Sequence, residues 1–106
     1  MASKKKNFSE LITQSDVPIL VDFYATWCCP CQTLSPVISD TARDFKEKLK
    51  VIKVDIDKNR SAAMKYNIQG VPTLILFQKG KILWRQSGLI TRKDLKNSLK
   101  RAISND

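Results

Sequence analysis

The sequence predicts an α/β protein with a central mixed sheet of four to five strands and helices on both faces. Short runs of β-branched and aromatic residues alternate with amphipathic helical segments along the chain, a pattern typical of such a sheet. Only a Lys-Gly pair at residues 79–80 separates the last two of these runs, so they should form an antiparallel hairpin. The 106 residues fit one domain, residues 1–106.

The bounds of the elements follow from capping signals and hydrophobic spacing. Asn7 with Glu10 forms a capping box for the first helix, and Thr91 with Asp94 caps the last one. In chain order we predict a helix over residues 8–14, a strand over 19–24, a long helix from Cys28 toward Leu49, a strand over 51–56, a short helix over 59–66, strands over 74–78 and 82–86, and a final helix from Thr91. The first two strands should run parallel across a right-handed crossover.

The N-terminus does not have the features of a targeting segment. It begins with basic residues, but it contains neither an apolar h-region nor a small-residue cleavage site. Residues 1–6 are predicted to be a frayed basic tail. No apolar run approaches the roughly 20 residues that span a bilayer. We therefore expect a cytoplasmic protein without a membrane partner, in a compartment where thiols are kept reduced.

The chain carries a formal net charge of +9 and contains no histidine. A basic surface favours acidic partners, but the lysines alternate with apolar residues at helical and strand spacing, as on solvated faces. We therefore expect no nucleic-acid partner, and we expect a monomer. The lack of histidine excludes Cys–His and Ser–His nucleophile pairs, histidine metal ligands and an imidazole proton shuttle. Acid–base chemistry must use carboxylates, thiols, lysines or water.

All three cysteines lie in one stretch, WCCPC, at residues 27–31. Cys28 and Cys31 form a C-x-x-C pair between a strand and a helix, a spacing that lets the two sulfurs bond in the first helical turn. Cys28 would lie at the helix N-terminus, where free N–H groups and the helix dipole favour a thiolate nucleophile. Cys31, one turn further and less exposed, would be the resolving thiol, and Pro30 stiffens the turn. The pattern predicts thiol–disulfide exchange, whereas a zinc site would need a second ligand pair that the sequence lacks.

The chain resembles the thioredoxin family over nearly its full length. The stretch VDFYATWCCPC is similar to the family's VDFWAxWCGPC, and Pro36, the strand VIKVDID, the segment YNIQGVPTLILFQKG and Gly88 follow in the family order. The general rule for the C-x-x-C motif is itself drawn from this family. The resemblance implies the thioredoxin fold and a protein-disulfide reductase that binds no cofactor. It also implies electrons from NADPH through a flavoprotein thioredoxin reductase, and disulfide-containing proteins as substrates.

The resemblance further implies roles for residues outside the C-x-x-C pair. Asp22 matches a buried aspartate that takes the proton of Cys31, and Lys53 matches a lysine near that aspartate. Burial in an apolar strand by itself predicts a raised pKa for the Asp22 carboxyl. A salt bridge to Lys53 is the other use of the same side chain, and the two uses are compatible. Val71-Pro72 matches a cis-proline loop whose backbone pairs with an extended substrate. The residues expected to line the substrate-binding surface are Trp27, Pro30, Gly70, Val71, Pro72 and Gly88.

The main departure from the family pattern is Cys29, which stands where the family usually has glycine. A Cys28–Cys29 bond would strain the peptide between the two residues, so Cys29 is predicted to be unpaired. Its role stays open among a passive side chain, an exposed thiol open to glutathionylation or dimerisation, and a metal or cluster ligand. The family's first edge strand would fall on residues 1–6, whose composition is poor for a strand, so we expect it to be short or absent.

Two other functions are open on the sequence alone. One is a disulfide oxidase or isomerase on the same fold. The proline before the second cysteine favours the reductase, because oxidising relatives often carry histidine there. The other is a metal- or iron–sulfur-binding or redox-sensing module that uses Cys28, Cys29 and Cys31.

Overall fold

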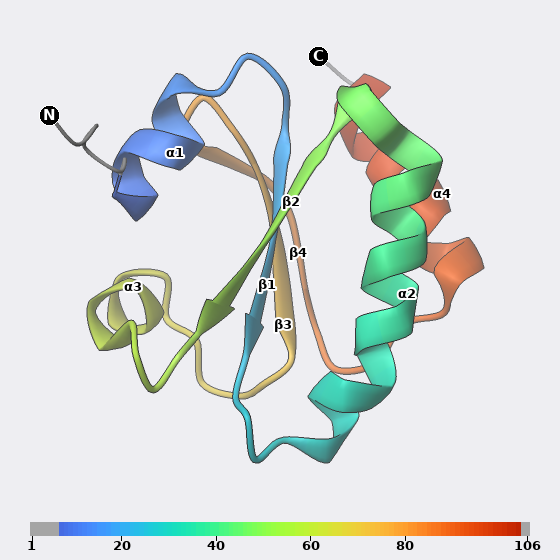
Figure 1. The fold of residues 1–106 in the computed structure, drawn as a ribbon. Coiled ribbons are helices and arrows are strands. Elements are labelled where there is room, and N and C mark those ends of the chain that lie inside the picture. Colours follow the sequence, from blue (N-terminus) through green and yellow to red (C-terminus); the bar gives the residue numbers. More distant parts are fainter. Residues whose placement is uncertain (1–6, 105–106) are drawn as a thin grey trace, which may run out of the picture.

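A four-stranded sheet lies between two pairs of helices in the computed structural model, which describes residues 7–104 (Figure 1). The strands are β1 (Ile19–Tyr24), β2 (Lys50–Asp55), β3 (Thr73–Gln78) and β4 (Lys81–Ser87). The helices are α1 (Phe8–Gln14), α2 (Cys29–Phe45), α3 (Arg60–Lys65) and α4 (Arg92–Ser104), with a 3-10 turn at Lys46–Lys48. Helices α1 and α3 cover one face of the sheet, and α2 and α4 cover the other (Figure 1).

The strand order is β2-β1-β3-β4. Strands β1 and β2 pair parallel, whereas β3 pairs antiparallel with both β1 and β4. The predicted mixed sheet, the parallel first pair and the final hairpin are therefore confirmed. The basic tail and the possible edge strand that we predicted for residues 1–6 lie outside the described residues.

Helix α2 ends earlier than its hydrophobic spacing predicts. The pattern extends toward Leu49, but the helix stops at Phe45, and Lys46 adopts a φ of 47°. The Lys46 backbone N–H still donates to the Ala42 carbonyl, and the 3-10 turn that follows carries the buried Leu49 into the core. The apolar spacing persists past the helix end because the turn keeps these side chains facing the sheet.

Alternate side chains along the strands divide the core into two parts. The α2-side core lies under α2 and α4, and its buried members are Leu20, Leu34, Ile38, Phe45, Leu49, Leu74, Leu76, Leu95 and Leu99. The α1-side core lies under α1 and α3, and its buried members are Ile12, Ile19, Val21, Phe23, Val54, Ile75 and Phe77. Asp22 alternates with Val21 and Phe23 along β1, so its carboxyl lies on the α2 side, the face that carries the cysteines.

Candidate active site

The site lies at the start of α2, just after the short loop that follows β1. Cys28 is the N-cap of α2, and a disulfide joins it to Cys31 in the first helical turn, with the two Cα atoms 5.3 Å apart. The Cys31 backbone N–H donates to the Cys28 Sγ at 3.1 Å. The pair is the one predicted from the C-x-x-C spacing. The sulfur that begins the helix therefore receives one of the free N–H groups of the helix start, which favours a thiolate when the disulfide is reduced.

The exposure of the two cysteines differs from the prediction. We expected Cys31 to be less exposed than Cys28, but in the disulfide form both are buried, with 4% of Cys28 and 6% of Cys31 accessible. The reason is that Ala25 and Val71 pack against the pair. Position rather than exposure distinguishes the two sulfurs, because the Cys28 Sγ lies 3.7 Å from the Val71 carbonyl oxygen, at the loop where a substrate backbone is expected.

Cys29 is exposed and unpaired, as predicted. It occupies the first position of α2, next to Pro30. Cys28 and Cys31 are bonded to each other, so their sulfurs do not form a metal site together with Cys29. Among residues 7–104 no group of three or more cysteine, histidine or acidic side chains is arranged to hold a metal ion. This geometry does not favour the metal or cluster module.

The cis-proline loop faces the disulfide. The Val71-Pro72 peptide is cis, and Val71 packs against the two cysteines. The loop is held to the end of β4, because the Gly88 N–H donates to the Pro72 carbonyl at 2.8 Å. Gly88 has a φ of +86°, a conformation that glycine adopts without strain. A Cβ on Gly70 would meet nothing within 4 Å, so that side of the loop is open.

Trp27 is 67% exposed, so it does not serve as a core side chain. Its indole Nε1 donates to the Asp57 carboxylate at 2.9 Å, which holds the ring beside the loop that follows β2. We did not predict a role for Asp57, and no motif in the sequence marks it. Pro30 is also exposed, so Trp27 and Pro30 both present apolar surface near the disulfide.

Asp22 is the buried carboxyl that the sequence predicts. Only 2% of the residue is accessible, and its Oδ1 has no hydrogen-bond partner. Desolvation raises the pKa of Asp22 from 3.8 to about 6, against the opposing attraction of the Lys53 ammonium. The carboxyl can therefore exchange a proton close to neutral pH.

Lys53 lies directly opposite Asp22 in the parallel register of β1 and β2, but the alternative of a salt bridge between them is wrong. The ion pairs of residues 7–104 do not include this one. The Lys53 Nζ instead donates to the Ser35 Oγ at 2.9 Å and lies 5.8 Å from the centre of the Tyr24 ring. Ser35, on α2, is a second residue that the sequence did not single out.

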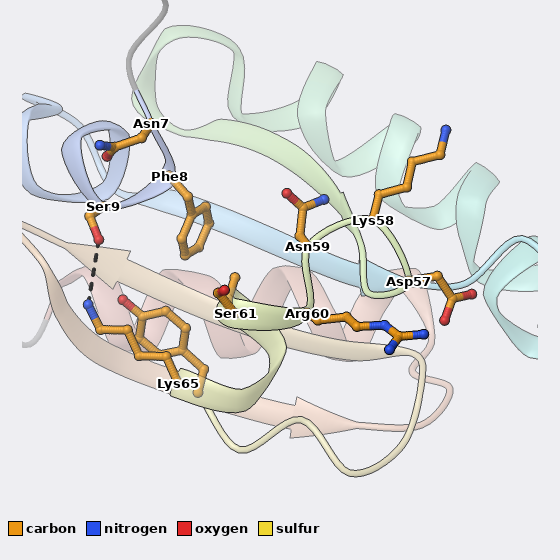
Figure 2. Close-up of a pocket in the computed structure, with 11 residues that line it drawn as sticks. Asn7, Phe8, Ser9, Asp57, Lys58, Asn59, Arg60, Ser61 and Lys65 are labelled. Atoms are coloured by element: carbon orange, nitrogen blue, oxygen red, sulfur yellow. Dashed lines mark hydrogen bonds between the residues drawn. The ribbon is translucent and has the colours of Figure 1, made fainter.

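A hollow of about 580 Å³ lies between α1 and α3, next to the site (Figure 2). Phe8 and Tyr66 supply its apolar lining, and Asp57, the partner of Trp27, lies at its rim. Lys58, Arg60 and Lys65 also line it. Figure 2 shows the Lys58 and Arg60 side chains extending away from Phe8, whereas Lys65 donates to the Ser9 hydroxyl. The cations therefore do not converge on one point, and the hollow does not form an anion site.

None of the helices in the described part of the chain is both long enough and apolar enough to span a bilayer.

Comparison with known proteins identifies the family. The family model named Thioredoxin matches residues 1–101. A thioredoxin from Rickettsia bellii is 42% identical over 101 residues, which is 95% of this chain and 92% of that protein. A thioredoxin from Pseudomonas aeruginosa is 39% identical over 89 residues, covering 84% of this chain and 82% of that protein. Thioredoxin Y1, chloroplastic, from Arabidopsis thaliana is 44% identical over 84% of this chain, which spans 52% of that relative's length.

The fold, the disulfide at the start of α2 and these matches agree. The chain belongs to the thioredoxin family of thiol–disulfide oxidoreductases.

Proposed function

We propose that this protein reduces disulfides in other proteins, with Cys28 as the nucleophile and Cys31 as the resolving thiol. The observation that supports these roles is the position of the two sulfurs. The Cys28 Sγ caps α2 and accepts the Cys31 N–H, while Cys31 lies inside the first turn at bonding distance. A thiolate at a helix N-terminus is the more nucleophilic of two such thiols at neutral pH.

The exchange proceeds in two steps. The Cys28 thiolate attacks one sulfur of the substrate disulfide, which forms a mixed disulfide and releases the other substrate sulfur as a thiolate that takes up a proton. Cys31 then loses its proton and attacks the Cys28 Sγ, which releases the second substrate thiol. Two electrons and two protons pass to the substrate, and the protein is left with its Cys28–Cys31 disulfide.

Asp22 accepts the Cys31 proton in the second step, directly or through water. Its position on the α2 side of β1 and its pKa of about 6 support this role, because a base works best when its pKa lies near the working pH. Lys53 contributes by its charge, which opposes the effect of burial on the Asp22 carboxyl.

The substrate segment binds along the loop that faces the disulfide. The Val71 carbonyl oxygen lies 3.7 Å from the Cys28 Sγ, next to the cis peptide bond to Pro72, and an extended segment there would pair with Val71. The exposed ring of Trp27 borders the same site. The remaining members of this substrate-binding surface are Pro30, Gly70 and Gly88.

The electrons come from NADPH through a flavoprotein thioredoxin reductase, which reduces the Cys28–Cys31 disulfide after each cycle. We place the protein in the cytoplasm as a monomer. Two of the relatives come from bacteria and one is named as chloroplastic, and a reducing compartment is what a disulfide reductase requires.

The test is turnover of a protein disulfide with dithiothreitol by the wild type and three single variants. Cys28→Ser abolishes turnover because no nucleophile is left. Cys31→Ser accumulates the mixed disulfide, which mass spectrometry detects as the sum of the two chains. Cys29→Ser is the matched control, because Cys29 lies one residue after Cys28 and two before Cys31, and it keeps its activity.

An inactive Cys29→Ser variant would contradict the assignment of the pair. The direction of the reaction is tested separately by a redox titration of the Cys28–Cys31 couple. A reduction potential in the range of oxidising folding catalysts would instead support the disulfide oxidase or isomerase.

A further inference from the structure

Ser35 links the helix of the active site to the sheet. It lies four residues after Cys31 on α2, so the two side chains share a helix face. Its Oγ accepts a hydrogen bond from the Lys53 Nζ at 2.9 Å, and this bond joins α2 to β2. The reaction scheme above assigns no role to Ser35.

The Lys53 ammonium has a second possible partner close by. Asp22 is its opposite residue in the β1–β2 register, and the buried Asp22 Oδ1 has no hydrogen-bond partner. A lysine stem is long and flexible, and a buried carboxylate without a partner attracts a cation strongly. The ammonium nevertheless bonds to Ser35 and lies over the Tyr24 ring rather than on the carboxylate.

We propose that Ser35 is a positioning residue whose hydroxyl holds the Lys53 ammonium on α2 and keeps it out of contact with the Asp22 carboxylate. This inference rests on the proposed function, in which Asp22 is the proton acceptor. In this proposal, Ser35 sets how strongly the Lys53 charge lowers the pKa of the Asp22 carboxyl.

The consequence follows from the two opposing effects on the carboxyl. With Lys53 held at Ser35, desolvation outweighs the attraction of the ammonium, and the pKa of Asp22 is about 6. A cation in direct contact lowers a carboxyl pKa by about 1–3 units. Releasing Lys53 would therefore make Asp22 a weaker base that stays ionised to lower pH, and the proton acceptor would no longer be matched to neutral pH.

Few other titratable groups lie near Asp22, so a change in its pKa can be assigned to Lys53. From β3 its register partner is Leu74, which does not titrate, and the buried side chains that α2 and α4 place against this face of the sheet, apart from Cys31, are apolar or, at Thr41, a hydroxyl. The remaining titratable groups are Lys53 and the buried Asp55 on β2, the Tyr24 hydroxyl on β1, and the thiols of Cys28 and Cys31 at the start of α2. The thiols do not titrate while the disulfide is intact, so the oxidised protein isolates the carboxyl.

The experiment is an NMR titration of the Asp22 side-chain carboxyl in the oxidised full-length protein. Ser35→Ala removes the hydroxyl on a helical position that alanine favours, so the fold is kept. We expect the Asp22 pKa to fall by about one unit. Ser35→Thr keeps a hydroxyl and should titrate like the wild type.

A double-variant comparison shows whether Ser35 acts through Lys53. Lys53→Met removes the ammonium and raises the Asp22 pKa above that of the wild type. Adding Ser35→Ala to Lys53→Met should then produce no further change. An unchanged or raised pKa in Ser35→Ala overturns the proposal, and so does a Ser35→Ala shift that persists when Lys53 is already methionine.

The pH profile of mixed-disulfide resolution separates this inference from the proposed function. If the wild-type profile follows the Asp22 titration and Ser35→Ala moves both to lower pH, both proposals are supported. If Ser35→Ala moves the NMR titration but no profile follows Asp22, the positioning role of Ser35 stands and the catalytic role of Asp22 fails. If the wild-type profile follows Asp22 but Ser35→Ala moves neither, the positioning role alone fails.

Discussion

The two faces of the sheet are formed by the same strands but are filled differently. On the α1 side, the rings of Phe8, Phe23, Tyr66 and Phe77 pack against one another with centres 5.0–6.4 Å apart. On the α2 side the core is mostly leucine and isoleucine, and Asp22 is buried on the same face of β1.

The face that contributes most of the aromatic packing is therefore not the face that carries the reactive groups. Aromatic rings in edge-to-face contact contribute beyond the area they bury, so the α1 side stabilises the sheet without carrying any reactive group. The α2 side carries the disulfide helix and a carboxyl without a hydrogen-bond partner on its Oδ1, which costs stability when it is ionised. One face can keep a destabilising buried carboxyl because the other face supplies the packing.

The largest expected effect is on the aromatic core. Leu76 and Phe77 are neighbours on β3, both fully buried, and they face opposite sides of the sheet. We expect Phe77→Ala to lower the free energy of unfolding by about 3–5 kcal/mol, near the upper end of that range, because contacts with the Phe8 and Tyr66 rings are lost as well. Leu76→Ala, the matched variant, should cost about 2–5 kcal/mol, and less than Phe77→Ala. Urea unfolding of the oxidised proteins measures both.

A cost for Leu76→Ala equal to or above that of Phe77→Ala would show that the aromatic face does not dominate. The two variants should both keep the Cys28–Cys31 exchange where they fold, because neither side chain belongs to the site.

The next effect is that of the buried carboxyl on the other face. The folded-state pKa of Asp22, about 6, lies above its ordinary 3.8, so between these values the folded protein retains a proton that the unfolded chain has released. Stability therefore falls as pH rises through this window and stays lower above it. Asp22→Asn removes the ionisation, and we expect the variant to be more stable than the wild type near neutral pH, on the order of 1–3 kcal/mol. Below about pH 4 the difference should largely disappear.

Denaturant unfolding of both proteins across this pH range makes the measurement. Asp16→Asn is the control, because Asp16 is an exposed carboxylate, and it should not change the pH dependence in this way. If Asp22→Asn keeps the wild-type loss of stability between pH 4 and 6, another group is responsible.

The smallest expected effects are at the helix caps, which offer one matched site on each face. The Asn7 Oδ1 accepts the Glu10 N–H at 2.8 Å at the start of α1, and the Thr91 Oγ1 accepts the Asp94 N–H at 3.1 Å at the start of α4. Replacing either cap residue by alanine should cost about 1 kcal/mol. Thermal unfolding compares the two. A cost for Asn7→Ala as large as that of Phe77→Ala would mean that the α1 face depends on docking of the whole helix rather than on ring packing.

Most of the fold could be predicted because its signals are local. The capping box at Asn7 appears in the structure, and residues 19–24 form the predicted strand within the same bounds. The end of α2 was predicted less well, since apolar spacing does not distinguish a helix from the 3-10 turn that carries Leu49 inward. The Cys28–Cys31 pairing was also predictable, because three residues of separation in a helix start leave little choice of partner.

The sequence by itself determined the element order, the pairing of the thiols and the burial of one carboxyl, since each follows from neighbours along the chain. Only the tertiary structure decided that Lys53 bonds to Ser35, 18 residues away, and that Trp27 bonds to Asp57, 30 residues away. It also decided that Cys28 is as buried as Cys31, because Val71 comes from a distant loop to cover both. The physical reason is that a side chain's choice among polar partners depends on which surfaces meet after the sheet and helices pack. Local propensity and spacing do not encode that choice.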